Sequence, residues 1–154
     1  MTSSRSGPRP LDAAEEAFVR ALARVTYAVP RAFDADLQRA EGLSLIEYFT
    51  LMFLSEAPGQ SLRMNELAAA HAVTLGAVTR IASRLESDGS VRREKSEEDG
   101  RGWNAVLTEA GLQRLQHAWP VHLASVRRHV LDNAGDLDLA NAARSMNDFA
   151  VERP

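Results

Sequence analysis

The pattern that most restricts the fold lies in residues 61–108, where two short helical stretches precede two strand-like stretches. The first helical stretch covers residues 64–70. The second follows Thr74, whose hydroxyl can accept a hydrogen bond from a free backbone N–H of the first helical turn. It runs to about residue 88, and Gly89 can then take the left-handed conformation that ends many helices. The apolar residues are Leu67 and Ala68 in the first helix and Leu75, Val78, Ile81, Ala82 and Leu85 in the second.

Two strands are expected directly after the second helix. Residues 91–95 and 103–107 have strand character, and the charged segment 96–102 between them contains two glycines. This pattern predicts a β-hairpin with a longer loop. Residues 61–63 can add a third strand to the same sheet. Two helices joined by a tight turn and followed by a hairpin form a winged helix-turn-helix, whose second helix can enter the major groove of DNA.

The side of the second helix opposite its apolar stripe carries residues suited to DNA. Gly76 and Ala77 are small, so backbone N–H groups of the first turn could approach phosphates or bases. Thr79 and Arg80 follow, and an arginine can bind guanine O6 and N7 with two hydrogen bonds. The candidate contacts on this helix are Thr74, Gly76, Ala77, Thr79, Arg80 and Arg84.

The hairpin offers further candidate contacts. Arg101 lies in its loop, from which it could enter the minor groove, and Asp99 could orient the Arg101 guanidinium. Cations near the first helix and along the first hairpin strand could bind phosphates, which position a protein on DNA without reading its sequence. These phosphate candidates are Arg63, Arg92, Arg93 and Lys95.

The net charge gives no independent support for DNA binding. It is −3 for the whole chain, and residues 61–108 contain seven basic and seven acidic residues. A DNA-binding surface would therefore have to come from the arrangement of charges on one face. The balanced charge keeps open an alternative, a winged-helix module that binds another protein and not DNA.

Several short motifs in this segment resemble those of the MarR family of winged helix-turn-helix transcriptional regulators. They are NELA at 65–68, VTRIASRLESDG at 78–89, VRRE at 91–94, the D-x-R pair of Asp99 and Arg101, and LTEAG at 107–111. The resemblance implies a homodimer that binds a pseudo-palindromic operator, most often as a ligand-responsive repressor. The chain departs from the family pattern at Arg63, where serine or threonine is frequent, at Ser90, where a large apolar residue is usual, and at Gly100, where a second basic residue is frequent.

Helical patterns flank the winged segment on both sides. Residues 11–41 carry apolar side chains at three- and four-residue steps, although Pro30 should kink or break a helix there. Ser44 and Glu47 match a capping box before an apolar helix. The expected fold is mainly α with a small β wing. It comprises a disordered tail (1–10), a winged helix-turn-helix (42–108) and N- and C-terminal helices (11–41 and 109–151) that, by the resemblance, form the dimerisation region.

The resemblance also implies a small-molecule effector site between the dimerisation helices and the winged segment. Aromatic residues and one histidine from both regions are the candidates, although each could equally belong to an ordinary hydrophobic core. These residues are Tyr27, Phe49, Phe53, Trp119 and His122.

Other functional classes find little support. The chain has no cysteine, which excludes a disulfide framework and a thiol sensor. His117 and His122 are five residues apart, so they do not share a helical face as metal ligands, and neither a metal nor a cofactor is expected. Ser125 and His129 are four apart, but without an orienting group they do not indicate a hydrolase, and a helix surface or dimer face is expected for both. With no membrane-length apolar run or signal-peptide pattern, the expected location is the cytoplasm.

Overall fold

The computed structural model describes residues 7–96 and 102–150, and within them it contains six α-helices and three β-strands. The mainly α fold with a small β sheet is therefore confirmed. Two short 3₁₀ turns, Pro58–Gln60 and Leu131–Asn133, complete the regular structure of these residues. The elements are α1 (Ala13–Glu41), α2 (Leu45–Glu56), β1 (Ser61–Arg63), α3 (Met64–Ala70), α4 (Leu75–Ser87), β2 (Val91–Lys95), β3 (Trp103–Leu107), α5 (Glu109–His129) and α6 (Leu139–Ala150).

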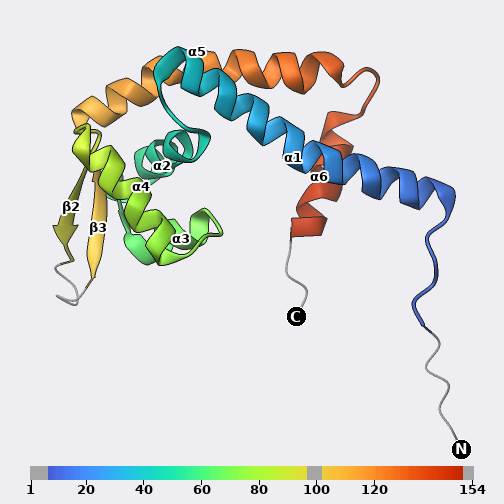
Figure 1. The fold of residues 1–154 in the computed structure, drawn as a ribbon, viewed down its shortest axis with the longest axis horizontal. Coiled ribbons are helices and arrows are strands. Elements are labelled where there is room, and N and C mark those ends of the chain that lie inside the picture. The colour runs from blue at the N-terminus through green and yellow to red at the C-terminus, as the bar shows by residue number, and fades with distance from the viewer. Residues whose placement is uncertain (1–6, 97–101, 151–154) are drawn as a thin grey trace, which may run out of the picture.

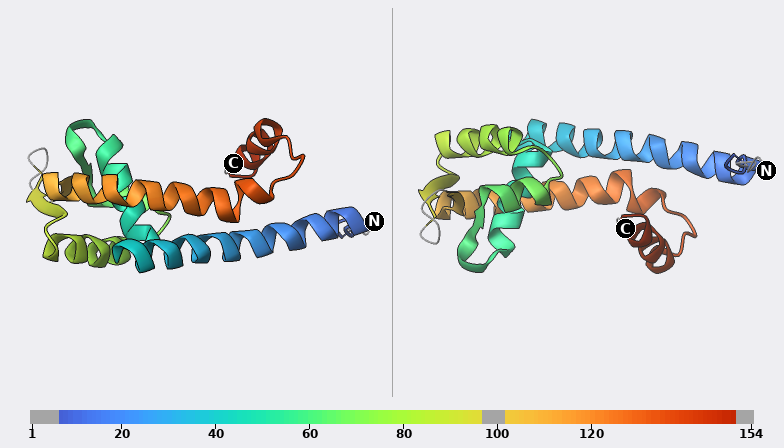
Figure 2. Two further views of the ribbon diagram at one scale, coloured as in Figure 1. Left: turned by 90° about the horizontal axis from the view of Figure 1, so that it is seen from above. Right: turned by 90° about the horizontal axis from the view of Figure 1, so that it is seen from below.

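The two longest helices, α1 and α5, pack along each other and form the long axis of the molecule. Helices α2, α3 and α4 and the β-hairpin lie together at one end of this pair (Figure 1). The N-terminal half of α1 and the short helix α6 extend toward the opposite end, as both views of Figure 2 show. In the described part of the chain, no helix is long and apolar enough to cross a membrane.

Helix α1 begins two residues later than expected and is continuous. Asp12 caps it by accepting hydrogen bonds from the N–H groups of Ala14 and Glu15, each at 2.9 Å. The helix continues through Pro30 to Glu41, so the expected break is absent, although proline removes one backbone donor from the helix. Gly42, with φ of 60°, then ends it.

Helix α2 supplies the centre of the hydrophobic core. The predicted capping box is present, because Glu47 accepts from the Ser44 N–H at 2.8 Å and the Ser44 hydroxyl oxygen faces the Glu47 N–H at 3.4 Å. α2 is covered by α3, α4, α5 and β3, which explains why it is apolar on nearly all sides. The core side chains with no exposed surface include Leu37, Leu43, Tyr48, Leu51, Leu54, Leu67, Ala82 and Leu85.

The sheet confirms the predicted hairpin and third strand. β3 lies between β1 and β2 and is antiparallel to both, with Ala105 opposite Leu62 on one side and Arg93 on the other. Gly89 has the left-handed φ of 79° that was expected after α4. At the start of α5, Gly111 lies so close to the sheet that an added Cβ would overlap the Ser90 carbonyl oxygen. This contact fixes α5 against the hairpin.

The apolar stripe of α4 is not buried along its whole length. Val78, Ala82 and Leu85 are buried and Ile81 is partly buried, but the side chain of Leu75 is 53% exposed. Leu75 belongs to the apolar stripe but not to the core, because the first turn of α4 borders an open cleft beside the sheet. Helical spacing identifies one side of a helix but does not show how far the neighbouring elements extend along it.

Candidate DNA-binding surface

The first turn of α4 is capped by Thr74, as expected. Its hydroxyl oxygen accepts from the Ala77 N–H at 3.3 Å, and its carbonyl oxygen accepts from the same group at 3.0 Å. The N–H of Ala77 is therefore already used, and a phosphate contact through it would have to displace the cap. Gly76 is exposed, and an added Cβ there would meet no atom within 4 Å. The start of α4 can thus approach another molecule closely.

Thr79 and Arg80 lie on the exposed side of α4. The Thr79 hydroxyl donates to the Leu75 carbonyl oxygen at 2.8 Å, so its hydrogen is occupied and its oxygen remains able to accept from a base. Arg80 has no ion-pair partner among residues 7–96 and 102–150. Its guanidinium is therefore available to an external acceptor.

Arg84 differs from Arg80, although both were predicted DNA contacts. Its Nε donates to Oε1 of Glu47 at 2.8 Å, and Glu47 is only 3% exposed. The same carboxylate accepts from the N–H and the hydroxyl of Ser44 at 2.8 and 2.6 Å. Arg84 therefore connects the candidate recognition helix to the start of α2, while its side chain stays largely exposed.

The hairpin cations are mostly held by carboxylates. Arg93 donates to Glu86 through its backbone N–H at 3.2 Å, Nε at 2.8 Å and Nη2 at 2.6 Å. The Arg93 hydrogen bonds lower the pKa of Glu86. Arg92 pairs with Glu94 at 2.8 Å, and Lys95 is exposed. The sequence did not reveal the Glu86–Arg93 pair, whose residues lie on either side of the α4–β2 turn.

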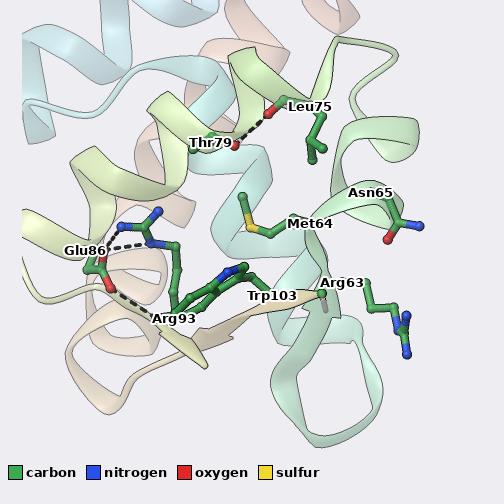
Figure 3. A pocket seen from close by; sticks show the side chains of 9 residues that line it. Arg63, Met64, Asn65, Leu75, Thr79, Glu86, Arg93 and Trp103 are labelled. Atoms are coloured by element: carbon green, nitrogen blue, oxygen red, sulfur yellow. Dashed lines mark hydrogen bonds and ion pairs between the residues drawn. The ribbon is translucent and has the colours of Figure 1, made fainter. Parts of the chain in front are cut away.

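A cleft of about 730 Å³ separates α4 from α3 and the hairpin. Figure 3 shows Leu75 and Thr79 on the α4 side of this cleft, and Arg93 held by Glu86 near Trp103 on the sheet side. Apolar, polar and charged side chains all contribute to its walls. The cleft is lined by Arg63, Met64, Asn65, Leu75, Thr79, Glu86, Arg93, Gly102 and Trp103.

The structure explains two departures from the family pattern. Arg63 begins α3 without a serine or threonine, and Glu66 compensates by accepting from the Arg63 N–H at 3.0 Å. Ser90 is buried, and its hydroxyl oxygen accepts from Nη1 of Arg114 at 3.3 Å, which a large apolar residue could not do. Arg114 also pairs with Asp88 at the end of α4. The predicted wing residues Asp99 and Arg101, and Gly100, lie outside the described residues.

Three of the five candidate effector residues lie together. The Phe49 ring is 6.2 Å from Phe53 and 5.8 Å from His122, measured between centroids. Tyr27 is 75% exposed in a separate groove along α1, and Trp119 is 52% exposed, so neither joins this cluster. The sequence missed Tyr48, whose ring lies 4.6 Å from His122.

Burial determines the ionisation of this aromatic cluster. It lowers the pKa of His122 and His71 and raises that of Tyr48 to about 12. The Tyr48 hydroxyl and His122 Nδ1 are buried without a hydrogen-bond partner in the described part of the chain. A cavity of about 400 Å³ between α1 and α2 reaches Phe49 but neither of these atoms.

Ser125 is fully buried, contrary to the expectation of a helix surface or dimer face. Its hydroxyl donates to Oδ2 of Asp36 at 2.6 Å, and His129 Nε2 lies 3.0 Å from the same oxygen. Arg39 donates to Oδ1 at 3.0 Å, and Arg128 also pairs with the carboxylate. Mainly through the Ser125 hydrogen bond, these partners hold the pKa of Asp36 well below its usual range despite burial. Asp36 therefore joins α1 to α5 and was not identified from the sequence.

Comparison with known proteins places this architecture in one family. A MarR family model matches residues 41–102. The crystal structure of Sco3205 from Streptomyces coelicolor, a MarR family regulator in complex with DNA, is 32% identical with a TM-score of 0.87 and covers 95% of this chain and 91% of that one. AbsC, another MarR family regulator from S. coelicolor, is 35% identical with a TM-score of 0.84, covering 93% and 96%.

A curated relative agrees over a shorter segment. The transcriptional repressor YetL of Bacillus subtilis is 34% identical over 95 residues, which are 62% of this chain and 56% of YetL. The chain thus spans little more than half the length of that relative. The two structural matches extend over nearly the whole of both chains, and on this evidence the chain belongs to the MarR family of transcriptional regulators.

Proposed function

We propose that the chain is a sequence-specific double-stranded DNA-binding regulator that acts as a homodimer and represses transcription. The observation that carries this proposal is the exposed side of α4, where Arg80 has no ion-pair partner in the described part of the chain. Arg80 lies in the second turn of α4, six residues after the Thr74 cap, within the N-terminal part through which recognition helices contact base edges. Thr79, Arg80 and Gly76 would face the major groove.

The relatives support the same role. Sco3205 was crystallised with DNA. Its similarity to this chain extends over both the helical arm, formed by α1, α5 and α6, and the winged segment. YetL is a transcriptional repressor. We therefore propose DNA binding by similarity to Sco3205 and repression by similarity to YetL.

Other residues are proposed to contact DNA outside the major groove. The proposed phosphate contacts are Arg63, Arg92, Arg93 and Lys95, and the proposed minor-groove contacts are Asp99 and Arg101.

The neutral charge of residues 61–108 does not favour the protein-binding alternative. Glu86 and Glu94 are paired with Arg93 and Arg92, so each pair cancels one negative and one positive charge of this segment, and Asp88 is paired with Arg114 of α5. Arg93 is oriented by its carboxylate and keeps a partly exposed side chain. Paired carboxylates of this kind limit non-specific attraction to phosphates while leaving cations in defined positions.

The proposed dimer would cover apolar side chains that the single chain leaves exposed. The N-terminal part of α1, the second half of α5, α6, and the segments directly before α1 and between α5 and α6 carry large hydrophobic residues with a third or more of their surface exposed. Such a patch is typical of a protein–protein interface. Its members are Leu11, Phe18, Val19, Val25, Trp119, Leu123, Val130, Leu131, Leu137, Leu139, Met146 and Phe149.

We also propose control by a small-molecule effector bound near Phe49, Phe53 and His122, between the helical arm and α2. The two winged segments of the dimer must have the spacing that DNA requires. A ligand that binds more tightly to a dimer with a different spacing would weaken operator binding. We assign no enzymatic role, because the Ser125 hydroxyl donates to Asp36 and not to His129. A regulator of this kind would act where the DNA lies, in the cytoplasm.

Selection of bound DNA from a random pool tests the proposal. We expect a pseudo-palindromic consensus whose half-sites are about 10 bp apart, because a twofold dimer presents its recognition helices on one face of the duplex. Enrichment of no sequence over the starting pool would contradict DNA reading. A consensus with a single asymmetric half-site would contradict the dimeric arrangement.

A further inference from the structure

Leu75 is an apolar side chain placed where a DNA reader is expected to be polar. It is the first residue of α4 and is 53% exposed. A single exposed leucine is ordinary on a protein surface, so the exposure alone has no meaning. The position of Leu75 is informative, because the N-terminal residues of a recognition helix contact base edges directly.

The neighbouring residues leave the Leu75 side chain accessible. Thr79 donates its hydroxyl hydrogen to the Leu75 carbonyl oxygen at 2.8 Å, which fixes the side chain of Thr79 on the same flank of the helix. Both residues line the cleft between α4 and the hairpin, as Figure 3 shows. Gly76 adds no side chain between Leu75 and the surroundings, and nothing lies within 4 Å of its missing Cβ. Another molecule can therefore reach the Leu75 methyl groups.

The chemistry of the major groove identifies an apolar counterpart. Among the base edges there, thymine is the one that presents a methyl group, at C5. We infer that Leu75 packs against the 5-methyl group of a thymine and is a specificity-determining residue. This inference rests on the proposed DNA-binding function and adds a base that the chain recognises without a hydrogen bond.

Uracil substitution tests the contact, because deoxyuridine pairs like thymidine but lacks the methyl group. In the selected operator, each thymine is replaced singly by deoxyuridine and the affinity is measured. At one thymine per half-site we expect the replacement to weaken binding about fourfold, the effect of one buried methyl-sized group. Leu75→Ala should bind the thymine and uracil operators equally. Leu75→Met, which keeps an apolar side chain of similar size, should still distinguish them.

Arg80→Ala is the matched control on the same helix. It should weaken binding to both operators but keep the thymine-to-uracil ratio of the parent protein. The inference is overturned if no thymine shows the methyl effect, or if Leu75→Ala retains it. These outcomes leave DNA binding itself intact, whereas failure to select any operator would contradict the proposed function and the inference with it. Circular dichroism of each variant establishes that the fold is unchanged.

Discussion

Arg80 and Arg84 lie one turn apart on α4 but have different surroundings. Arg80→Ala should cost roughly 1–3 kcal/mol of operator binding and relax the preference at one position per half-site, since it removes a base contact. The stability of the folded protein should not change, because Arg80 pairs with no described residue. Binding profiles on a library of operator variants, together with urea unfolding, measure both effects.

Arg84→Ala should show the reverse pattern. It leaves the buried Glu47 carboxylate without its cation, so the free energy of unfolding should fall by about 1–3 kcal/mol. The base preferences of the folded variant should match those of the parent protein. If Arg84→Ala alters the consensus at one position while its stability is unchanged, its assignment as an anchor of α4 is wrong.

At the scale of single residues, the sequence predicted the features that depend on near neighbours. The Thr74 cap and the Gly89 terminus were correct because both depend on residues within one helical turn. The partner of Arg84 could not be predicted, since Glu47 is distant in sequence and its burial results from the packing of α2. Tyr27 and Trp119 were wrongly grouped with Phe49. The spacing of aromatic residues along a helix does not show which of them another helix covers.

At the scale of elements, the contact between α1 and α5 depends on the Asp36 carboxylate. Its partners hold the pKa of Asp36 below its usual range, whereas in the unfolded chain it is about 3.9. The carboxylate therefore stabilises the fold above pH of about 4, and this contribution is lost as the pH falls below that value. The helices that it joins should separate more readily in acid.

Asp36→Asn tests this contribution. At pH 7 the free energy of unfolding should fall by about 3 kcal/mol, as expected when one partner of a buried ion pair is removed. Between pH 6 and pH 3 the variant should lose less stability than the parent protein, because it lacks the titrating group. Asp132→Asn, at an exposed position, is the control. Parallel stability curves for Asp36→Asn and the parent would contradict the assignment.

Two histidines that pack against α2 also make stability depend on pH, and they gain a positive charge in acid where Asp36 loses a negative one. Burial lowers the pKa of His122 and His71, so both are neutral in the folded protein at pH 7. Below pH of about 6.5 the unfolded chain binds protons that the folded chain does not, and stability falls by up to about 1.4 kcal/mol per pH unit for each histidine.

His122→Phe keeps an aromatic ring beside Tyr48 and Phe33 but cannot be protonated. The loss of stability between pH 7 and pH 5 should therefore be smaller in this variant than in the parent protein. Thermal unfolding at both pH values measures the difference. His117→Phe, at an exposed position of the same helix, should leave it unchanged, and an equal change in both variants would contradict the role of burial.

The order of the elements was predictable because each helix and strand carries a local pattern. The capping box at Ser44 and Glu47 and the hairpin signals around residues 96–102 gave elements that match the structure. The contact between Asp36 and Ser125 could not be predicted, because the two residues are 89 positions apart and neither belongs to a motif. The break at Pro30 is absent, since a long helix can tolerate one missing hydrogen bond when packing against α5 supports it.

At the scale of the whole molecule, the exposed apolar side chains of α1, α5 and α6 predict an obligate dimer. Light scattering should give about twice the chain mass of 16.9 kDa, because the exposed side chains of α1 and α6 gain a partner surface. Phe149→Asp, on α6, should shift the protein toward monomer and weaken operator binding. Asp148→Asn, next to it, is the control. A parent protein that remains monomeric and folded at micromolar concentration would contradict the proposed assembly.

The unbroken course of α1 has a mechanical consequence. The helix rises about 1.5 Å per residue, so its N-terminal end lies about 35 Å from the point where Asp36 attaches it to α5. Over that length, a rotation of about 10° at the attachment corresponds to a displacement of about 6 Å at the N-terminal end. A small rotation of the 29-residue helix near Asp36 therefore becomes a much larger displacement at its N-terminal end.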